Sequence, residues 1–304
     1  MKKNTILIVL FLLVSLSFAQ QQAQFTQYMY NTISINPAYA GSREQMVVNL
    51  LNRNQWVGVN GAPITQTLSI HTSIPSTKLG IGLSVVNDRL AYERTTYLAT
   101  DVSYTIKLRD EYQLAFGVKI GASKFSLDDD ILNDPEYNDD PFLDYLYYKW
   151  SPNIGAGLYF RSDSWYLGFS APKLINYAAN QSLEYINLDR VSYYFNGGYL
   201  FEVNKHIKVK PTFLLKYTSG APISVDISGS ILLNDKLWLS GFYRFNDSFG
   251  ALANFKVSDA MSIGYSYDYI VTDLRPFTSG SHEIILNYEF PFPRPSCKCK
   301  NLYN

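Results

Sequence analysis

The chain has 304 residues, and its 26 lysines and arginines balance its 26 aspartates and glutamates, so its formal net charge is zero. A neutral chain gives no electrostatic argument for a nucleic-acid partner or for binding to an acidic surface. Tyrosine (25) and phenylalanine (18) are abundant, yet beyond residue 20 no apolar run is long enough for a membrane helix. The composition therefore favours a secreted β-sandwich or an outer-membrane β-barrel with aromatic girdles.

Residues 1–19 have the pattern of a secretory signal peptide. Two lysines precede an apolar run from Ile6 to Phe18, and the small residue Ala19 follows it. The run is too short to span a bilayer comfortably as a permanent helix. No cysteine follows the expected cleavage point, so we expect no lipid attachment there and a mature chain that begins at Gln20. The alternative is a buried N-terminal helix of a cytosolic protein.

The next segment, residues 20–43, follows neither helical nor strand periodicity. Its distinguishing residues are three tyrosines with large amphipathic rings and three residues that interrupt regular structure: Tyr28, Tyr30, Tyr39, Asn36, Pro37 and Gly41.

From about residue 44 to residue 290, apolar and polar residues alternate in segments of roughly ten residues, which predicts β-strands with one apolar face. In the stretch from Tyr112 to Gly121, every second residue is large and apolar, and the residues between them are small or polar. About fourteen such segments occur, and bacterial single-chain barrels have an even strand number.

The connections distinguish a barrel from a sandwich. Tight turns are expected at Ser76 and Thr77, 109–111, 162–163, 234–236 and 258–259, and long loops at 126–149, 172–188 and 270–281. Short and long connections that alternate are typical of an outer-membrane barrel. We therefore predict an all-β fold, a transmembrane antiparallel barrel, with a bulge at Pro211 because proline cannot donate to the ladder. A charged substitution at Phe116, Val118 or Ile263 on the lipid face should destabilise the inserted barrel, and Gly117→Ser should destabilise it less.

An even strand number with short periplasmic turns places both termini in the periplasm and the long loops outside the cell. A barrel of this size has a lumen that something must fill. We therefore expect residues 24–41 to fold back into the periplasmic mouth as a plug, with tyrosine rings packed against small lumen residues. A flexible arm that docks on periplasmic machinery is the alternative.

The acidic loop between residues 127 and 150 is the first candidate for partner binding. Its charged and aromatic residues are Asp128, Asp129, Asp130, Asp139, Asp140, Tyr145, Tyr147 and Trp150. Exposed tyrosine and tryptophan beside charge favour an interface. A solvated loop and a metal site are the alternatives, although the glycine and terminal glutamate of an EF-hand loop are missing.

Residues 291–304 form a tail in which three prolines precede Cys297 and Cys299. A local disulfide, a bridge to a partner and a soft-metal site all stay open for these cysteines. The three histidines have no accompanying nucleophile motif, so we expect no enzyme and no catalytic, cofactor-binding or metal-binding residues.

Mixed charges are expected to face the lumen. They are Lys107, Lys119, Lys208, Lys210 and Lys216, against Asp101, Asp226, Asp268, Glu283 and Glu289. Internal ion pairs would stiffen and help to seal the barrel, and a weakly selective pore is the alternative.

The stretch from Gln24 to Gly41 resembles the N-terminal signature of the PorP/SprF family of type IX secretion system membrane proteins. Residues 52–72, 196–199 and 279–290 resemble further parts of the family, and the tail departs from a plain barrel end. The resemblance implies a non-enzymatic outer-membrane barrel. It would bind a cargo protein, often an adhesin, through the cargo's C-terminal targeting domain, and would help to export or retain it at the cell surface, as in gliding motility. Other secretion components, some of them periplasmic, and lipid would be its partners. A passive or substrate-selective channel is the alternative function, and the cargo stays unidentified.

Overall fold

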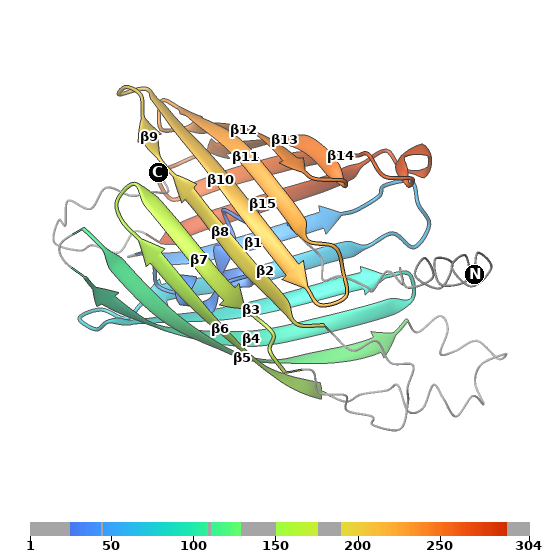
Figure 1. Ribbon diagram of the computed structural model, residues 1–304, viewed down its shortest axis with the longest axis horizontal. Coiled ribbons are helices and arrows are strands. Elements are labelled where there is room, and N and C mark those ends of the chain that lie inside the picture. The colour runs from blue at the N-terminus through green and yellow to red at the C-terminus, as the bar shows by residue number, and fades with distance from the viewer. Residues whose placement is uncertain (1–24, 44, 109–110, 129–149, 176–189, 291–304) are drawn as a thin grey trace, which may run out of the picture.

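The structure is a computed structural model that describes residues 25–43, 45–108, 111–128, 150–175 and 190–290. Its described residues form fifteen strands and three 3-10 helices (Figure 1). The strands are β1 (Met46–Asn54), β2 (Ile64–Ser73), β3 (Leu79–Leu90), β4 (Glu93–Lys107), β5 (Gln113–Leu127), β6 (Trp150–Arg161), β7 (Trp165–Ala171), β8 (Ser192–Tyr199), β9 (Phe201–Glu202), β10 (Ile207–Thr218), β11 (Ser224–Leu233), β12 (Leu237–Arg244), β13 (Ser248–Lys256), β14 (Met261–Ile270) and β15 (Ser281–Phe290). The 3-10 helices are η1 (Thr32–Ser34), η2 (Pro37–Tyr39) and η3 (Arg275–Phe277).

The sheet closes on itself. β1 pairs with both β2 and β15, and β10 pairs with β11, so the described strands form a continuous antiparallel ring. β8 and β9 both pair with β10 and are two pieces of one barrel strand, so the fifteen strands make a wall of fourteen. A closed wall leaves no unpaired backbone edge, which a strand structure needs inside lipid. The predicted fourteen-stranded barrel is confirmed.

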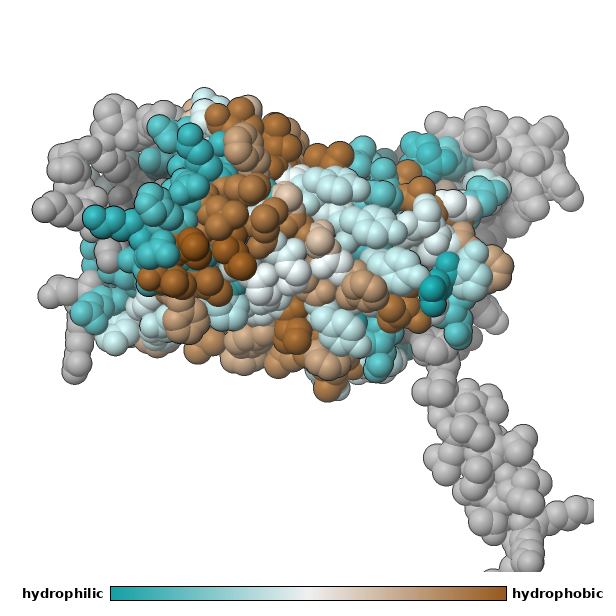
Figure 2. Space-filling model, turned by 90° about the horizontal axis from the view of Figure 1, so that it is seen from above, coloured by the Kyte–Doolittle hydropathy of each residue, from teal (hydrophilic) through white to brown (hydrophobic). Residues whose placement is uncertain are grey.

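Period-two alternation decides which side chains face lipid. On β5, Phe116 and Val118 are 45% and 47% exposed, whereas Ala115 before them and Lys119 after them are buried. Apolar and aromatic residues gather over the middle of the visible face, with hydrophilic residues toward its two ends (Figure 2). Such a band between polar ends is typical of a bilayer-spanning barrel. No helix among the described residues is long and apolar enough to cross a membrane.

The two ends of the barrel differ in their connections. At one end, here called the short-turn end, lie the connections β2–β3, β4–β5, β6–β7, β9–β10, β11–β12 and β13–β14, with the start of β1 and the end of β15. The opposite, long-loop end carries the β5–β6, β7–β8 and β14–β15 connections. The predicted alternation is incomplete, because two connections at the long-loop end are also short: residues 91–92 and 245–247.

The bulge predicted at Pro211 is wrong. Thr212 pairs with Gly198 and Val209 with Phe201, so the same number of residues separates the pairs on both strands and none is inserted. The strand is instead interrupted at Leu200, between β8 and β9. Pro211 sits on the exposed face opposite Gly229 of β11. The missing proline N–H is accommodated by this local break in the β8–β9 strand, without a change of register.

Residues 25–43, here called the lumen segment, lie inside the wall of strands (Figure 1). The segment contains η1 and η2 and turns into β1 at the short-turn end. From there it runs back along the lumen, and Thr26 reaches Asp268 and Glu283, which lie near the long-loop ends of β14 and β15. The segment therefore extends further along the barrel than the expected position at one mouth.

Candidate functional site

A buried charge cluster holds the first residues of the lumen segment. The Glu283 carboxylate accepts hydrogen bonds from the backbone N–H groups of Thr26 (3.1 Å) and Gln27 (2.8 Å). The Thr26 hydroxyl donates to Asp268 at 2.7 Å. Arg53 bridges both carboxylates, at 3.0 Å from Glu283 and 2.8 Å from Asp268, and also donates to the Thr26 hydroxyl. Charge-assisted bonds of this kind are about twice as strong as neutral ones, so they fix the end of the segment.

The middle of the segment packs against the wall through its aromatic rings. Tyr28 lies among Tyr194, Leu214 and Leu252, and its hydroxyl is 3.2 Å from the Thr212 hydroxyl. Tyr30 lies beside the Lys210 ammonium, 5.9 Å from the ring centre. Burial raises the pKa of both phenols, so both stay neutral.

Asn36 and Pro37 form the turn that starts η2. The Asn36 carboxamide oxygen accepts from the Ala38 N–H (3.0 Å), and its amide group donates to the Leu158 carbonyl (2.9 Å). The first bond caps a short helix with proline at its start. The second bond connects this turn to Leu158 of β6, so Asn36 contacts both its own turn and the barrel wall.

The turn lies directly against glycines of the wall. A Cβ atom at Gly117 would collide with the Ala38 backbone, and one at Gly157 would collide with the Asn36 side chain. At the next turn Gly41 has φ +67°, and a Cβ there would lie 2.6 Å from the Gly80 Cα. These glycines are needed because the segment approaches the wall at backbone distance.

Tyr39 of η2 packs in a buried cluster with Ala115, Tyr159 and Tyr166 of the wall. Its ring makes edge-on contacts with His71 (5.3 Å between centroids) and Tyr159 (5.4 Å). His71 is fully buried in this aromatic cluster. All six residues singled out in the N-terminal segment thus contact the barrel interior or shape the turns beside it.

Several lumen charges form pairs across neighbouring strands. Lys119 lies 2.9 Å from Asp101, and its ammonium also donates to the Ile33 carbonyl of the lumen segment at 3.3 Å. Arg244 pairs with Asp226 at 2.8 Å. Sequence reasoning missed Arg53 and Arg244, although both continue the inward-facing alternation of β1 and β12. That alternation was the signal that could have found them.

The acidic-loop candidates have different surroundings. Asp128, just after β5, accepts two hydrogen bonds from Arg94 (3.0 and 2.9 Å) and lies 3.1 Å from Arg89. This carboxylate is therefore paired with arginines of the barrel wall. Trp150 opens β6 on the outer face and is 46% exposed, as an aromatic girdle residue would be. The remaining candidates lie outside the described residues: Asp129, Asp130, Asp139, Asp140, Tyr145 and Tyr147. Cys297 and Cys299 lie outside them as well.

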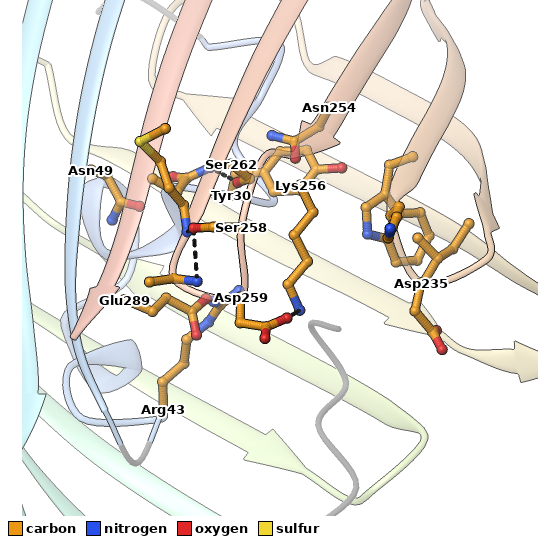
Figure 3. Close-up of a pocket in the computed structure, with 16 residues that line it drawn as sticks. Tyr30, Arg43, Asn49, Asp235, Asn254, Lys256, Ser258, Asp259, Ser262 and Glu289 are labelled. Atoms are coloured by element: carbon orange, nitrogen blue, oxygen red, sulfur yellow. Dashed lines mark hydrogen bonds and ion pairs between the residues drawn. The ribbon is translucent and has the colours of Figure 1, made fainter. Parts of the chain in front are cut away.

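A polar pocket of about 50 Å³ opens at the short-turn end of the lumen, beside Tyr30 (Figure 3). Its floor carries Asn49, Asn254 and Asn287 from β1, β13 and β15. Its rim carries charged residues that pair with one another, Arg43 with Glu289 and Lys256 with Asp259. The described residues contain no group of three or more His, Cys, Asp or Glu side chains that could hold a metal ion.

The family model described as "Type IX secretion system membrane protein PorP/SprF" matches residues 17–288. No curated protein sequence matches the chain significantly.

Solved outer-membrane barrels share the architecture. The crystal structure of the Ralstonia pickettii toluene transporter TbuX superposes with a TM-score of 0.51 at 11% identity, over 87% of this chain and 94% of that one. The Acinetobacter baumannii outer membrane protein Omp33 has a TM-score of 0.47 at 10% identity, over 82% and 98% of the two chains. A Pseudomonas aeruginosa FadL homologue has a TM-score of 0.46 at 13% identity, over 84% and 93%. At these identities the likeness concerns the fold.

Proposed function

Since the chain belongs to the PorP/SprF family of type IX secretion system membrane proteins, we propose that it is a partner-binding outer-membrane component of that system. It binds the C-terminal targeting domain of an adhesin-like cargo protein and helps to export it or to retain it at the cell surface. The family and the structurally similar proteins are outer-membrane proteins and transporters, and no reaction is part of this proposal.

In this proposal the short-turn end faces the periplasm and the long-loop end faces outward, as in bacterial barrels generally. Binding residues concentrate on loops that a rigid scaffold holds. The three longest connections, β5–β6, β7–β8 and β14–β15, leave the barrel at the same end and can form one recognition surface. The acidic residues between β5 and β6 supply charge for cargo recognition and for its specificity.

The observation that carries the proposal beyond family membership is the lumen segment. Its buried anchor at Glu283 and its backbone-distance contact with Gly117 and Gly157 occupy space that a passive channel would leave to water. This supports a holding or docking role over steady conduction. The rival function, a passive or substrate-selective channel, requires the segment to move or to leave a continuous path beside it.

Recovery of cargo from outer membranes tests the proposal. The tagged native protein should retain a large surface protein with a C-terminal targeting domain. Changing Asp129, Asp130, Asp139 and Asp140 to Asn should weaken that retention in a salt-dependent way. The matched control changes Asp235 and Asp259 at the short-turn end to Asn and should leave retention intact. Recovery without any such cargo, or equal loss in the control, would contradict the proposed role.

A further inference from the structure

Two arginines lie directly opposite each other on the outer face of the wall, at the long-loop end. Arg89 of β3 and Arg94 of β4 are cross-strand partners in a region where β3, β4 and β5 run side by side (Figure 1). The alternation of each strand turns both side chains away from the lumen, on the same face as Leu83 and Leu98. We call Arg89 and Arg94 the arginine pair.

Like charges directly opposite each other on one face of a sheet repel, so the arginine pair needs an anion beside it. Asp128 supplies one, because it accepts from Arg94 through both oxygens and lies 3.1 Å from Arg89. The other carboxylates on these two strands near the pair, Asp88 and Glu93, fall on the lumen side of the alternation. The two guanidinium groups therefore share a single carboxylate among the described residues of the outer face, and one positive charge is left over.

The arginine pair also keeps hydrogen-bond donors that no described residue uses. Arg94 donates to Asp128 only from Nη2, so its Nε and Nη1 groups have no acceptor in the described part of the chain. Arg89 donates from Nε to the Ala91 carbonyl (3.4 Å) and directs Nη2 to Asp128, which leaves Nη1. The two arginine side chains are 49% and 44% exposed, whereas the carboxylate is 8% exposed. The surface thus presents open guanidinium donors around a covered carboxylate.

The surrounding residues place the arginine pair at the level of lipid head groups. Leu98, four residues from Arg94 on the same face of β4, is 41% exposed and belongs to the apolar band. Between them lies Thr96, which pairs with Lys124, and Lys124 pairs with the girdle residue Trp150. Girdle aromatic residues mark the boundary between the apolar band and the head groups. Arg94 lies two residues beyond that row, on the side away from the band.

We propose that the arginine pair binds a phosphate group of a phosphorylated glycolipid in the outer leaflet of the membrane. A guanidinium group donates two parallel hydrogen bonds to a phosphate, and basic residues at a membrane surface attract anionic lipids. The apolar band beside the pair contacts the acyl chains of the same lipid. A lipid is favoured over an acidic peptide because both cations lie on the face of the wall that continues into this band. The choice of leaflet rests on the orientation in the proposed function, whereas cargo recognition does not enter.

Native mass spectrometry of the full-length protein in detergent micelles tests the site. The probe is diphosphoryl lipid A, an acylated glucosamine disaccharide with two phosphates, and the matched lipid has the same acyl chains without the phosphates. The wild type should bind the diphosphoryl lipid roughly tenfold more tightly, and this preference should fall as the salt concentration rises. Arg94→Gln should weaken binding of the diphosphoryl lipid roughly tenfold, through loss of charge-assisted bonds to phosphate. Arg94→Lys keeps the charge without the fork and should lose less.

Two further variants control for charge and folding. Lys205→Gln removes an exposed cation at the short-turn end, between β9 and β10, and should bind the diphosphoryl lipid as the wild type does. Arg94→Gln combined with Asp128→Asn leaves no carboxylate without its partner and should still bind the lipid weakly. The comparison of the two lipids on the wild type keeps the test decisive even where an Arg94 variant fails to fold.

Three results would overturn the site. The first is equal binding of the two lipids by the wild type. The second is tighter binding of a tetra-aspartate peptide than of the diphosphoryl lipid, which would assign the arginine pair to a protein partner. The third is lipid binding that appears only after Asp129, Asp130, Asp139 and Asp140 are changed to Asn, which would make the acidic loop the source of the anion. Because the micelle assay contains no cargo, a failure of cargo retention would not alter its result.

Discussion

At the scale of single residues, the glycines of the wall differ in what they face. A Cβ at Gly117 or Gly157 would collide with the lumen segment, whereas nothing lies within 4 Å of a Cβ at Gly229. The sequence predicted that Gly117→Ser would destabilise the barrel less than a charged substitution on the lipid face. The structure adds a packing cost to Gly117→Ser, because this part of the lumen is filled by Ala38 and Pro37.

We therefore expect Gly157→Ala to destabilise the barrel by about 1 to 3 kcal/mol, the usual cost of overpacking. Gly229→Ala should change the stability by less than about 0.5 kcal/mol. Urea unfolding in detergent, followed by the heat-modifiable shift in electrophoretic mobility, measures both. In a variant that lacks residues 24–41, Gly157→Ala should no longer destabilise the barrel. If it still did, Gly157 would not be in contact with the lumen segment.

Arg53 is the second residue whose effect can be predicted, because it is the cation between two buried carboxylates. Arg53→Met should destabilise the protein by about 3 to 5 kcal/mol, since it leaves Asp268 and Glu283 buried without their counter-charge. Arg89→Met is the control: Arg89 also pairs with a carboxylate, but its side chain is 49% exposed, and exposed pairs contribute about 0 to 1 kcal/mol.

The same unfolding measurement applies to the Arg53 variant. Changing Asp268 to Asn and Glu283 to Gln in the Arg53→Met background should recover part of the loss, because it removes the unpaired charges. If Arg53→Met and Arg89→Met proved equally mild, the buried cluster would not anchor the lumen segment.

At the scale of one element, β5 shows how the two faces of a strand are used. Val118 is 47% exposed and lies opposite Val102 and Ala156, in the middle of the wall, so it faces lipid. Val118→Arg should destabilise the inserted barrel by about 2 to 4 kcal/mol, and Asn52→Arg, near the long-loop end of β1, by about 0 to 1 kcal/mol.

Unfolding and refolding in lipid vesicles measures this difference. Both variants place arginine on the outer face, so depth in the bilayer is what distinguishes them. Equal tolerance of the two substitutions would refute the assignment of Val118 to the bilayer centre.

At the scale of the whole molecule, the lumen segment and the closed wall form one unit. Glu283 and Lys119 hold the segment from two sides of the barrel, through bonds to Gln27 and to the Ile33 carbonyl. Deleting residues 24–36 removes both contacts. We expect the deletion to raise ion conductance in a planar bilayer several-fold, with the barrel still folded, because the lumen is wide enough to hold water once it is emptied.

The wild-type protein and the Arg89→Met variant should both show low conductance in the same recording. A large steady conductance of the wild type would favour the channel. Unchanged conductance after the deletion, together with loss of co-purifying periplasmic components, would make the segment a docking arm.

The sequence by itself determined the barrel, since alternation with period two is a local property that shows in every strand. The inward and outward assignments of Val118 and Lys119 followed directly from it. Turn residues such as Asn234 and Asp235, both with positive φ, marked the strand ends locally as well. The six residues of the N-terminal segment could be singled out because its asparagine-proline and glycine interrupt regular structure and its tyrosines have large amphipathic rings.

Tertiary structure alone decided which of these residues meet. Arg53 and Glu283 are 230 positions apart, and they pair only because β1 closes the ring against β15. The pocket brings together Asn49, Asn254 and Asn287 from three strands, with Tyr30 placed beside them by the path of the segment. Local periodicity fixes the face of the strand on which a side chain lies. The neighbours of that side chain depend on strand register, on closure of the barrel and on the path of the irregular segment. Contacts across the whole chain set these three features.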